Sequence, residues 1–378
     1  MPTQVRMTTR EFIHNSLYHP KYGYFSKEAK VFSDSPIEFN NIKNNNDFFL
    51  HLGKLYENYG NDQIWHTPSE IFKPWYGYSI AKYIVSEFIK SGESELLIYE
   101  AGAGNGTLMN DIMTFIQSNH PDIYQSTRYT IIEISGKLAN IQRQNPHPVT
   151  VLNQSVLEFN ELQPKPCFFI ALEVLDNLSH DVVRYDGEEP VQGIVEIDEY
   201  RDYKEGYIPV TDPLLLEYLQ VRNSTNYKVP ILDWKTRAVD FINPFKANLS
   251  RREFVPTNAF QLLKNLNEYF PKHRLVLSDF DLLPDTIEGV DAPVVQTRHR
   301  DEMVACSTYL VQPGYFDIFF PTNFSLLNQI YQKLSGKRAN VLKHGDFLKQ
   351  YGNLAKTRTR SGDNPMVQYY ENVSFFLT

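Results

Sequence analysis

The chain has 378 residues, of which 42% are hydrophobic, and a formal net charge of −8 at pH 7. This length is enough for a large buried core, built as one large domain or as two ordinary ones. Two widely spaced cysteines exclude a disulfide framework and a zinc site, so no metal is expected. No long basic block favours nucleic acid, and no run approaches the roughly 20 apolar residues of a membrane span.

The first 90 residues are predicted to be largely helical. A cap at Thr8 or Thr9 begins a short helix that Pro20 ends, with one side formed by Phe12, Ile13, Ser16 and Leu17. The Asn-rich stretch at 33–62 is interpreted as an insertion or loop with one short helix near 48–60. Apolar and aromatic residues recur at helical spacing over 75–89.

From 96 to about 186, strands and helices alternate. The predicted strands are 96–100, 128–134, 148–152 and 167–174, and the helices between them are 107–117 and 136–144. This alternation is typical of a doubly wound parallel sheet in the α/β class.

The second half shows a less regular pattern. Helices are predicted near 213–222, 257–270 and 324–335, and strands at 273–280, 303–311 and 315–320. Because no linker interrupts these strands, we expect mixed or antiparallel additions to the first sheet in place of a separate domain.

Residues 100–108, EAGAGNGTL, place Gly102, Gly104 and Gly106 where a strand turns into a helix. Such a turn is compatible with a flexible connection or with a cofactor loop, since glycine lets the backbone approach a ligand closely. Glu100 would repel a dinucleotide pyrophosphate but suits the cationic amino group of an aminoacyl cofactor.

Glu133 ends the next strand, at the position where an acidic residue accepts both ribose hydroxyls. By itself, Glu133 is better explained as an exposed charge at a strand end. Together with Glu100 and the glycines, it favours S-adenosyl-L-methionine over NAD as the cofactor.

Glu173 and Asp176 follow the fourth strand, at the edge where open α/β sheets place reactive groups. Two carboxylates there can bind a guanidinium by charge-assisted hydrogen bonds and orient one nitrogen toward a methyl group. The alternative is a pair that caps the next element or binds a nearby arginine. His180 is a candidate base on the substrate side, although a lone histidine near a strand is more often structural.

Taken in order, several segments resemble the MidA-type family of S-adenosylmethionine-dependent protein arginine methyltransferases, whose eukaryotic members are mitochondrial complex I assembly factors. The segments are MTTREFIHNSLYHPKYGYFS (7–26), HTPSEIF (66–72), EAGAGNGTLMNDIM (100–113), IIEISGKLANIQ (131–142), ALEVLDNLSH (171–180) and PGYFDIFFPTNFSLL (313–327). The resemblance adds Thr107 and Ser135 to the cofactor side. It also implies that Thr67 and Glu70 close the site on the substrate side.

The resemblance implies a Rossmann-like class I (seven-strand) methyltransferase core with an N-terminal helical cap and substrate-side insertions. The cap would span 1–90 and the core 91–378, with an insertion near 200–256, as one integrated catalytic unit. The implied reaction is methylation of an arginine in a mitochondrial protein, a subunit of a respiratory or other complex. The resemblance also implies that the chain itself is located in the mitochondrial matrix. Three positions in 171–180 depart from the family pattern: Leu172, Asn177 and Ser179. They leave open a scaffold that binds partners during assembly without catalysis.

Overall fold

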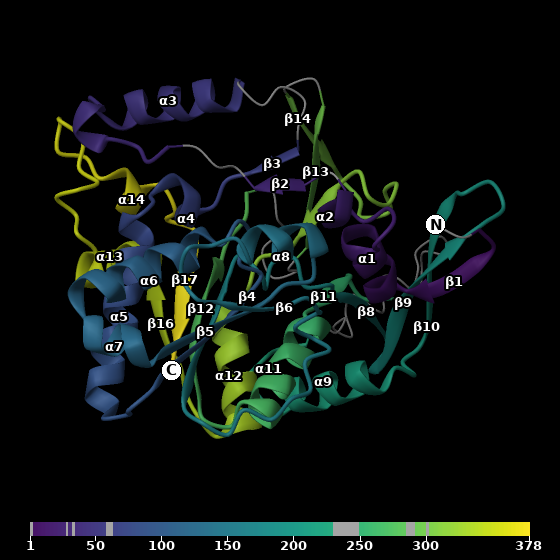
Figure 1. The fold of residues 1–378 in the computed structure, drawn as a ribbon. Coiled ribbons are helices and arrows are strands. Elements are labelled where there is room, and N and C mark those ends of the chain that lie inside the picture. Colours follow the sequence, from purple (N-terminus) through teal and green to yellow (C-terminus); the bar gives the residue numbers. More distant parts are fainter. Residues whose placement is uncertain are drawn as a thin grey trace.

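The computed structural model describes residues 3–27, 29–31, 35–57, 63–229, 249–284, 292–299 and 302–378. Its centre is a sheet with the strand order β16-β17-β12-β7-β4-β5-β6 (Figure 1). The strands from β12 to β6 are parallel, and β17 is antiparallel to both of its neighbours. The predicted α/β class with a mostly parallel sheet is confirmed. The strands are β4 (Leu96–Ala101), β5 (Thr127–Ile132), β6 (Thr150–Leu152), β7 (Cys167–Leu172), β12 (His273–Phe280), β16 (Asn340–Lys343) and β17 (Val373–Leu377).

Helices cover both faces of this sheet because its strands alternate their apolar side chains between two cores. In β7, Phe168 and Ile170 enter one core and Phe169 and Ala171 enter the other. The first core is completed by α5 (Trp75–Ser91), α6 (Thr107–Asn119) and α13 (His344–Tyr351). The second is completed by α9 (Pro213–Asn223), α11 (Thr257–Tyr269) and α12 (Phe324–Ser335). Figure 1 shows these two helical layers on opposite sides of the strands.

A second, antiparallel sheet was not expected from the sequence. It has the order β1-β9-β8-β11, and β10 pairs with β9. Its strands are β1 (Val5–Thr8), β8 (Asp181–Asp186), β9 (Glu189–Ile197), β10 (Tyr203–Pro209) and β11 (Glu253–Val255). Helix α1 (Thr9–Tyr18) packs on it through Phe12, Ile13 and Leu17. Of the two predicted caps, Thr8 or Thr9, the structure has Thr8, which forms a reciprocal capping box with Glu11.

The strands predicted at 303–311 and 315–320 do not join the main sheet. They are shorter, β14 (Glu302–Cys306) and β15 (Asp317–Phe319), and each pairs with β13 (Val294–His299). The expectation that they extend the first sheet was therefore wrong. Their pairing is with a neighbouring strand in sequence, which loop-closure entropy favours.

Shorter elements surround these sheets. The Asn-rich stretch carries the predicted helix, α3 (Asn45–Glu57), while 32–34 and 58–62 lie outside the described residues, as do 230–248 of the segment near 200–256. The remaining elements are α2 (Tyr24–Lys27), β2 (Ala29–Val31), η1 (Phe39–Asn41), β3 (Gln63–Trp65), α4 (Pro68–Ile71), α7 (Pro121–Ser126), α8 (Gly136–Gln142) and α14 (Pro365–Gln368).

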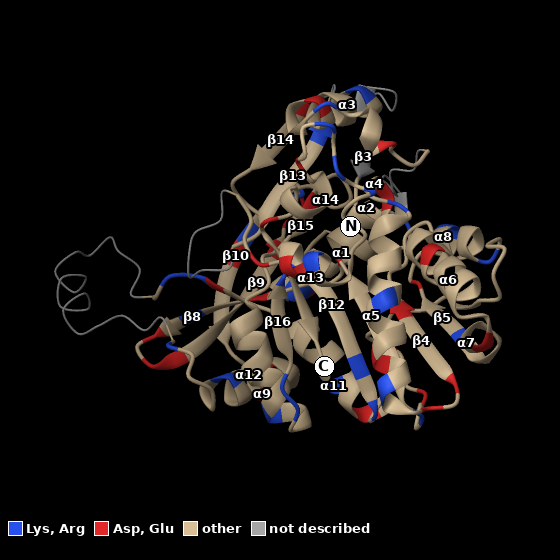
Figure 2. Ribbon diagram, turned by 90° about the vertical axis from the view of Figure 1, so that its left-hand side faces the viewer, with Lys and Arg blue, Asp and Glu red and all other residues tan. Residues whose placement is uncertain are grey.

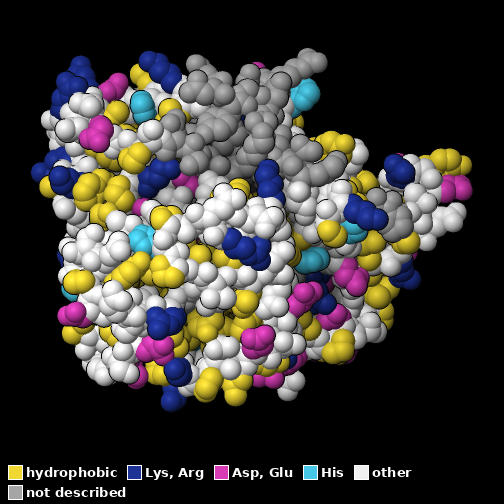
Figure 3. Space-filling model, in the orientation of Figure 1, with side chains coloured by type: hydrophobic (Ala, Val, Ile, Leu, Met, Phe, Trp, Pro, Cys, Tyr) yellow, Lys and Arg dark blue, Asp and Glu magenta, His cyan; other side chains and the backbone are white. Residues whose placement is uncertain are grey.

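Charged residues of both signs are interspersed along the elements (Figure 2) and across the face seen in Figure 3. Over the described ranges, no helix combines the length and apolar character needed to cross a membrane.

Candidate active site

A cavity of about 800 Å³ lies over the carboxyl ends of β4, β5 and β7. Its size falls within the usual range for a ligand pocket, roughly 300–1,000 Å³. Ten of the twelve residues predicted for the site line this cavity, and they include both cofactor-side and substrate-side residues. They are Thr67, Glu70, Glu100, Gly102, Gly104, Thr107, Glu133, Ser135, Glu173 and Asp176.

The glycine turn between β4 and α6 has a backbone that only glycine adopts easily. Gly102, Gly104 and Gly106 have φ angles of 66°, 54° and 80°, in the left-handed region that other residues avoid. A Cβ atom at Gly102 would lie 3.0 Å from Cγ2 of Val174. Gly106 is the N-cap of α6 and offers no side chain to its first N–H groups. The turn therefore brings bare backbone to the cavity.

Glu100 lies at the base of this turn, buried beneath the cavity. Its Oε2 accepts a hydrogen bond of 2.9 Å from the Tyr129 hydroxyl, and the residue is 3% exposed. Burial raises the pKa of Glu100 to about 8, and the nearby Glu133 adds to the rise. At neutral pH the carboxyl is mostly protonated, so a cationic group placed beside it would favour its ionisation.

Glu133 follows β5 and is held in place by its neighbours. Its Oε1 accepts from the backbone N–H of Ser135 (2.8 Å), and its Oε2 accepts from Nε2 of Gln142 (3.0 Å). The same Gln142 nitrogen donates to the Gly104 carbonyl at 2.8 Å. Gln142 thus fixes the glycine turn and Glu133 relative to each other. Burial raises the pKa of Glu133.

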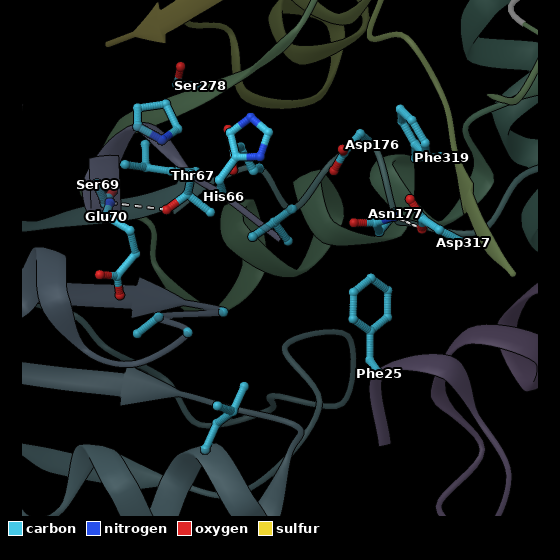
Figure 4. A pocket seen from close by; sticks show the side chains of 18 of the residues that line it. Phe25, His66, Thr67, Ser69, Glu70, Asp176, Asn177, Ser278, Asp317 and Phe319 are labelled. Atoms are coloured by element: carbon cyan, nitrogen blue, oxygen red, sulfur yellow. Dashed lines mark hydrogen bonds between the residues drawn. The ribbon is translucent and has the colours of Figure 1, made fainter. Parts of the chain in front are cut away.

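Glu70 reaches the cofactor side from the N-terminal region. Thr67 caps α4, and Glu70 on that short helix accepts from the Thr107 hydroxyl (2.7 Å) and from Asn105 Nδ2 (2.9 Å). Its second oxygen accepts from Lys73 Nζ at 2.8 Å. This helix is therefore fastened over the glycine turn, on one side of the cavity in Figure 4.

The opposite side of the cavity carries the acidic residues that follow β7. Glu173 has a φ of 53°, unusual for a residue other than glycine, and its N–H donates to the Ser278 carbonyl at 2.9 Å. Oε1 of Glu173 and Oδ1 of Asp176 are buried without a hydrogen-bond partner. Burial raises the pKa of both carboxyls well above the ordinary range, and repulsion from Asp279 raises it further.

Two further acidic residues belong to this region, and the sequence did not single them out. Asp279, at the end of β12, accepts from the N–H groups of Leu175 (2.8 Å) and Asp176 (3.2 Å) and so holds the loop after β7. Asp317, on β15, accepts from Nδ2 of Asn177 at 3.2 Å. The sequence feature that could have indicated Asp317 is its place in PGYFDIFF, where an acidic residue stands within an aromatic run.

His180 and Gly106 are the two predicted site residues that do not line the cavity. The His180 ring stacks on Phe320 with a centroid distance of 3.8 Å, and its Nδ1 lies 2.7 Å from the Leu178 carbonyl. Burial lowers the pKa of His180 to about 3. The structure thus places His180 in the packing behind the acidic loop, and gives it no contact with the cavity.

The described residues contain no group of three His, Cys, Asp or Glu arranged to hold a metal ion. The cavity instead joins a glycine turn with acidic residues at the ends of parallel strands, in a class I-like methyltransferase fold. The chain belongs to the family described as "Putative S-adenosyl-L-methionine-dependent methyltransferase", which matches residues 79–342. Its cofactor is S-adenosyl-L-methionine, as the sequence predicted, and the MidA-type resemblance is confirmed.

Individual relatives agree with this family. The protein arginine methyltransferase NDUFAF7 homolog, mitochondrial, of Schizosaccharomyces pombe is 22% identical over 92% of this chain and 80% of its own length. A Burkholderia thailandensis structure bound to S-adenosyl-homocysteine aligns with a TM-score of 0.63 at 15% identity, covering 98% of this chain and 87% of the other. A second structure from that organism aligns with a TM-score of 0.59 at 14% identity, with the same coverage. At these identities the structures support the fold.

Proposed function

We propose that this methyltransferase transfers the methyl group of S-adenosyl-L-methionine to a guanidinium nitrogen of an arginine in a protein. The bound cofactor supplies a methyl carbon made electrophilic by its sulfonium sulfur. An arginine nitrogen forms the new N–C bond, the C–S bond breaks with its electron pair going to sulfur, and the nitrogen loses one proton. The observation that carries the proposal is the pair of buried, unpartnered carboxylate oxygens on Glu173 and Asp176.

On the cofactor side, Glu100 would bind the amino group and Glu133 the ribose. Support comes from their burial below the glycine turn and from their raised pKa values, which a cationic or hydroxylated ligand would lower. Thr107 would hold the end of the glycine turn through its hydrogen bond to Glu70, and the Ser135 N–H would orient Glu133. Thr67 would fix the helix that closes this side.

On the acceptor side, Glu173 and Asp176 would bind the guanidinium. Buried carboxylates ordinarily have a cationic or hydrogen-bonding partner, and arginine presents five N–H donors in a planar fork. Holding the guanidinium from this side leaves one nitrogen directed at the methyl group, so catalysis would come mainly from proximity and orientation.

The name of the Schizosaccharomyces pombe relative supports extending the proposal to the cellular setting. The chain would act in mitochondria, on an arginine of a protein subunit during assembly of a respiratory or other complex. Residues 1–90 would form a cap over a catalytic core at 91–378.

The proposal is tested by quantitative mass spectrometry of mitochondrial arginine methylation in cells that lack the protein. Wild-type protein should restore at least one arginine methylation that the deletion removes. The double variant Glu173→Gln/Asp176→Asn should bind the cofactor without restoring it. Full restoration of the methylation by this variant would reject the proposed acceptor site. Impaired complex assembly in the deletion, with no arginine methylation lost, would instead support a scaffold.

A further inference from the structure

Asp317 reaches the acceptor side of the cavity from a different sheet than Glu173 and Asp176 do. It begins β15, which pairs with β13 through Gln296, whereas the other two follow β7 of the main sheet. Asp317 is 1% exposed and lines the same cavity. Figure 4 shows Asp176, Asn177 and Asp317 grouped on the side opposite Thr67 and Glu70.

The two carboxylate oxygens of Asp317 have different surroundings. Oδ1 accepts the hydrogen bond from Asn177, whereas Oδ2 is buried and has no partner. Glu173 and Asp176 also each have one such oxygen, and among the described residues no salt bridge joins these three carboxylates to a Lys, Arg or His. Burial raises the pKa of Asp317 well above its ordinary range.

Three buried carboxylate oxygens without hydrogen-bond partners belong to residues that line one cavity, where a ligand can reach them. If Asp317 only positioned Asn177, it would need only Oδ1 for that hydrogen bond. The backbone carbonyl of Asn177 in turn accepts from the Tyr18 hydroxyl at 3.1 Å. Oδ2 would then be desolvated without a compensating hydrogen bond, which is unfavourable. A guanidinium, with five N–H donors in a planar fork, would offer donors to several oxygens at once. A metal ion is disfavoured because the described residues form no metal-binding group.

We propose that Asp317 is a third carboxylate of the acceptor site, which binds the guanidinium from the sheet formed by β13, β14 and β15. The inference rests on the proposed function and extends it, because it makes the acceptor pocket a three-sided anionic site that selects arginine over neutral side chains of the same shape. The acceptor pocket is then formed jointly by the main sheet and by the three-stranded sheet β14-β13-β15. Strands β13, β14 and β15 therefore contribute to substrate selection.

The test uses N-acetyl-arginine methylamide and its neutral isostere N-acetyl-citrulline methylamide as probes, titrated by calorimetry into protein saturated with S-adenosyl-homocysteine. We expect wild-type protein to prefer the arginine probe by at least tenfold. Asp317→Asn should lower this preference at least tenfold while leaving S-adenosyl-homocysteine affinity unchanged. The matched control is Asp111→Asn, since Asp111 is 5% exposed, also has an unpartnered oxygen and does not line this cavity.

The outcomes distinguish failure of the proposed arginine acceptor from failure of the proposed role of Asp317. A wild-type protein that binds both probes equally would contradict arginine as the acceptor. A wild-type preference that Asp317→Asn retains would overturn only the role of Asp317. Asp317→Glu keeps the charge and should keep most of the preference, so equal losses in the Asn and Glu variants would indicate packing alone and also overturn the inference. Retained S-adenosyl-homocysteine binding shows that each variant is folded.

Discussion

Replacing Glu100 by glutamine should remove a pH dependence from cofactor binding. If the ionised carboxylate binds the cofactor amino group, affinity is proportional to the ionised fraction of the free protein. With a pKa of about 8, that fraction is about 1% at pH 6 and about 9% at pH 7. The Kd for S-adenosyl-L-methionine should therefore fall about ninefold over this pH unit, with release of nearly one proton.

Calorimetry at pH 6 and pH 7, in buffers with different ionisation enthalpies, measures both the Kd and the number of protons released. The ligand amino group stays protonated in this window, since α-amino groups titrate near pH 8, about one unit higher. Tyr129 and Glu133 are the titratable groups that face Glu100, so Glu133→Gln serves as the matched variant and should keep most of the dependence. A wild-type Kd that is constant over this range, or Glu100→Gln with wild-type affinity at pH 7, would refute the role of Glu100.

The same shift makes a prediction for stability. The pKa of Glu100 is higher in the folded protein than its ordinary value of 4.5, so its contribution to stability is greatest below about pH 4.5 and declines as pH rises toward 8. At pH 7 the carboxyl destabilises the free protein by about 3 kcal/mol. Glu100→Gln should therefore raise the unfolding free energy at pH 7 and have little effect near pH 4, as measured by chemical denaturation.

Three further predictions concern the cofactor side. Gly102→Ala should destabilise the fold by about 1–2 kcal/mol, because alanine is strained in the left-handed conformation, and should also weaken S-adenosyl-L-methionine binding. The control is Gly92→Ala, where φ is 70° and an added Cβ meets open space; it should lose stability without losing cofactor affinity. Gln142→Glu should raise the pKa of Glu133 further and weaken cofactor binding by about tenfold, measured by calorimetry; unchanged affinity would remove Glu133 from the ribose site. Glu70→Gln breaks the buried ion pair with Lys73 beside the glycine turn and should lower the unfolding free energy by about 1–3 kcal/mol in denaturant titrations, a result that an unchanged midpoint would contradict.

Local sequence signals accounted for the parallel half of the fold. The cap at Thr8, the helix over 75–89 and the strands before Gly102 and Glu133 are set by short-range capping, periodicity and glycine conformation. These same signals bring the cofactor-side residues to one sheet edge, because parallel strands end together. For that reason most of the candidate cavity was predictable.

Long-range pairing accounts for what the sequence did not reveal. Strand β17 enters the main sheet between β12 and β16 from the end of the chain, and the β8–β10 segments pair with β1 and β11 from distant positions. Asp317 lies about 140 positions from Asn177, its hydrogen-bond partner. No local pattern indicates that one of its oxygens is buried and unpartnered, since that depends on how separate sheets meet.

Transfer of an isotope-labelled methyl group to arginine tests the central claim most directly. Purified protein would be incubated with S-adenosyl-L-methionine carrying a deuterated methyl group and a mitochondrial extract from cells that lack the enzyme. Tandem mass spectrometry would then locate the label. The account predicts labelled methyl on an arginine nitrogen, present with wild-type protein and absent with Glu173→Gln/Asp176→Asn. Label on another residue type, or equal arginine labelling with both proteins, would contradict it.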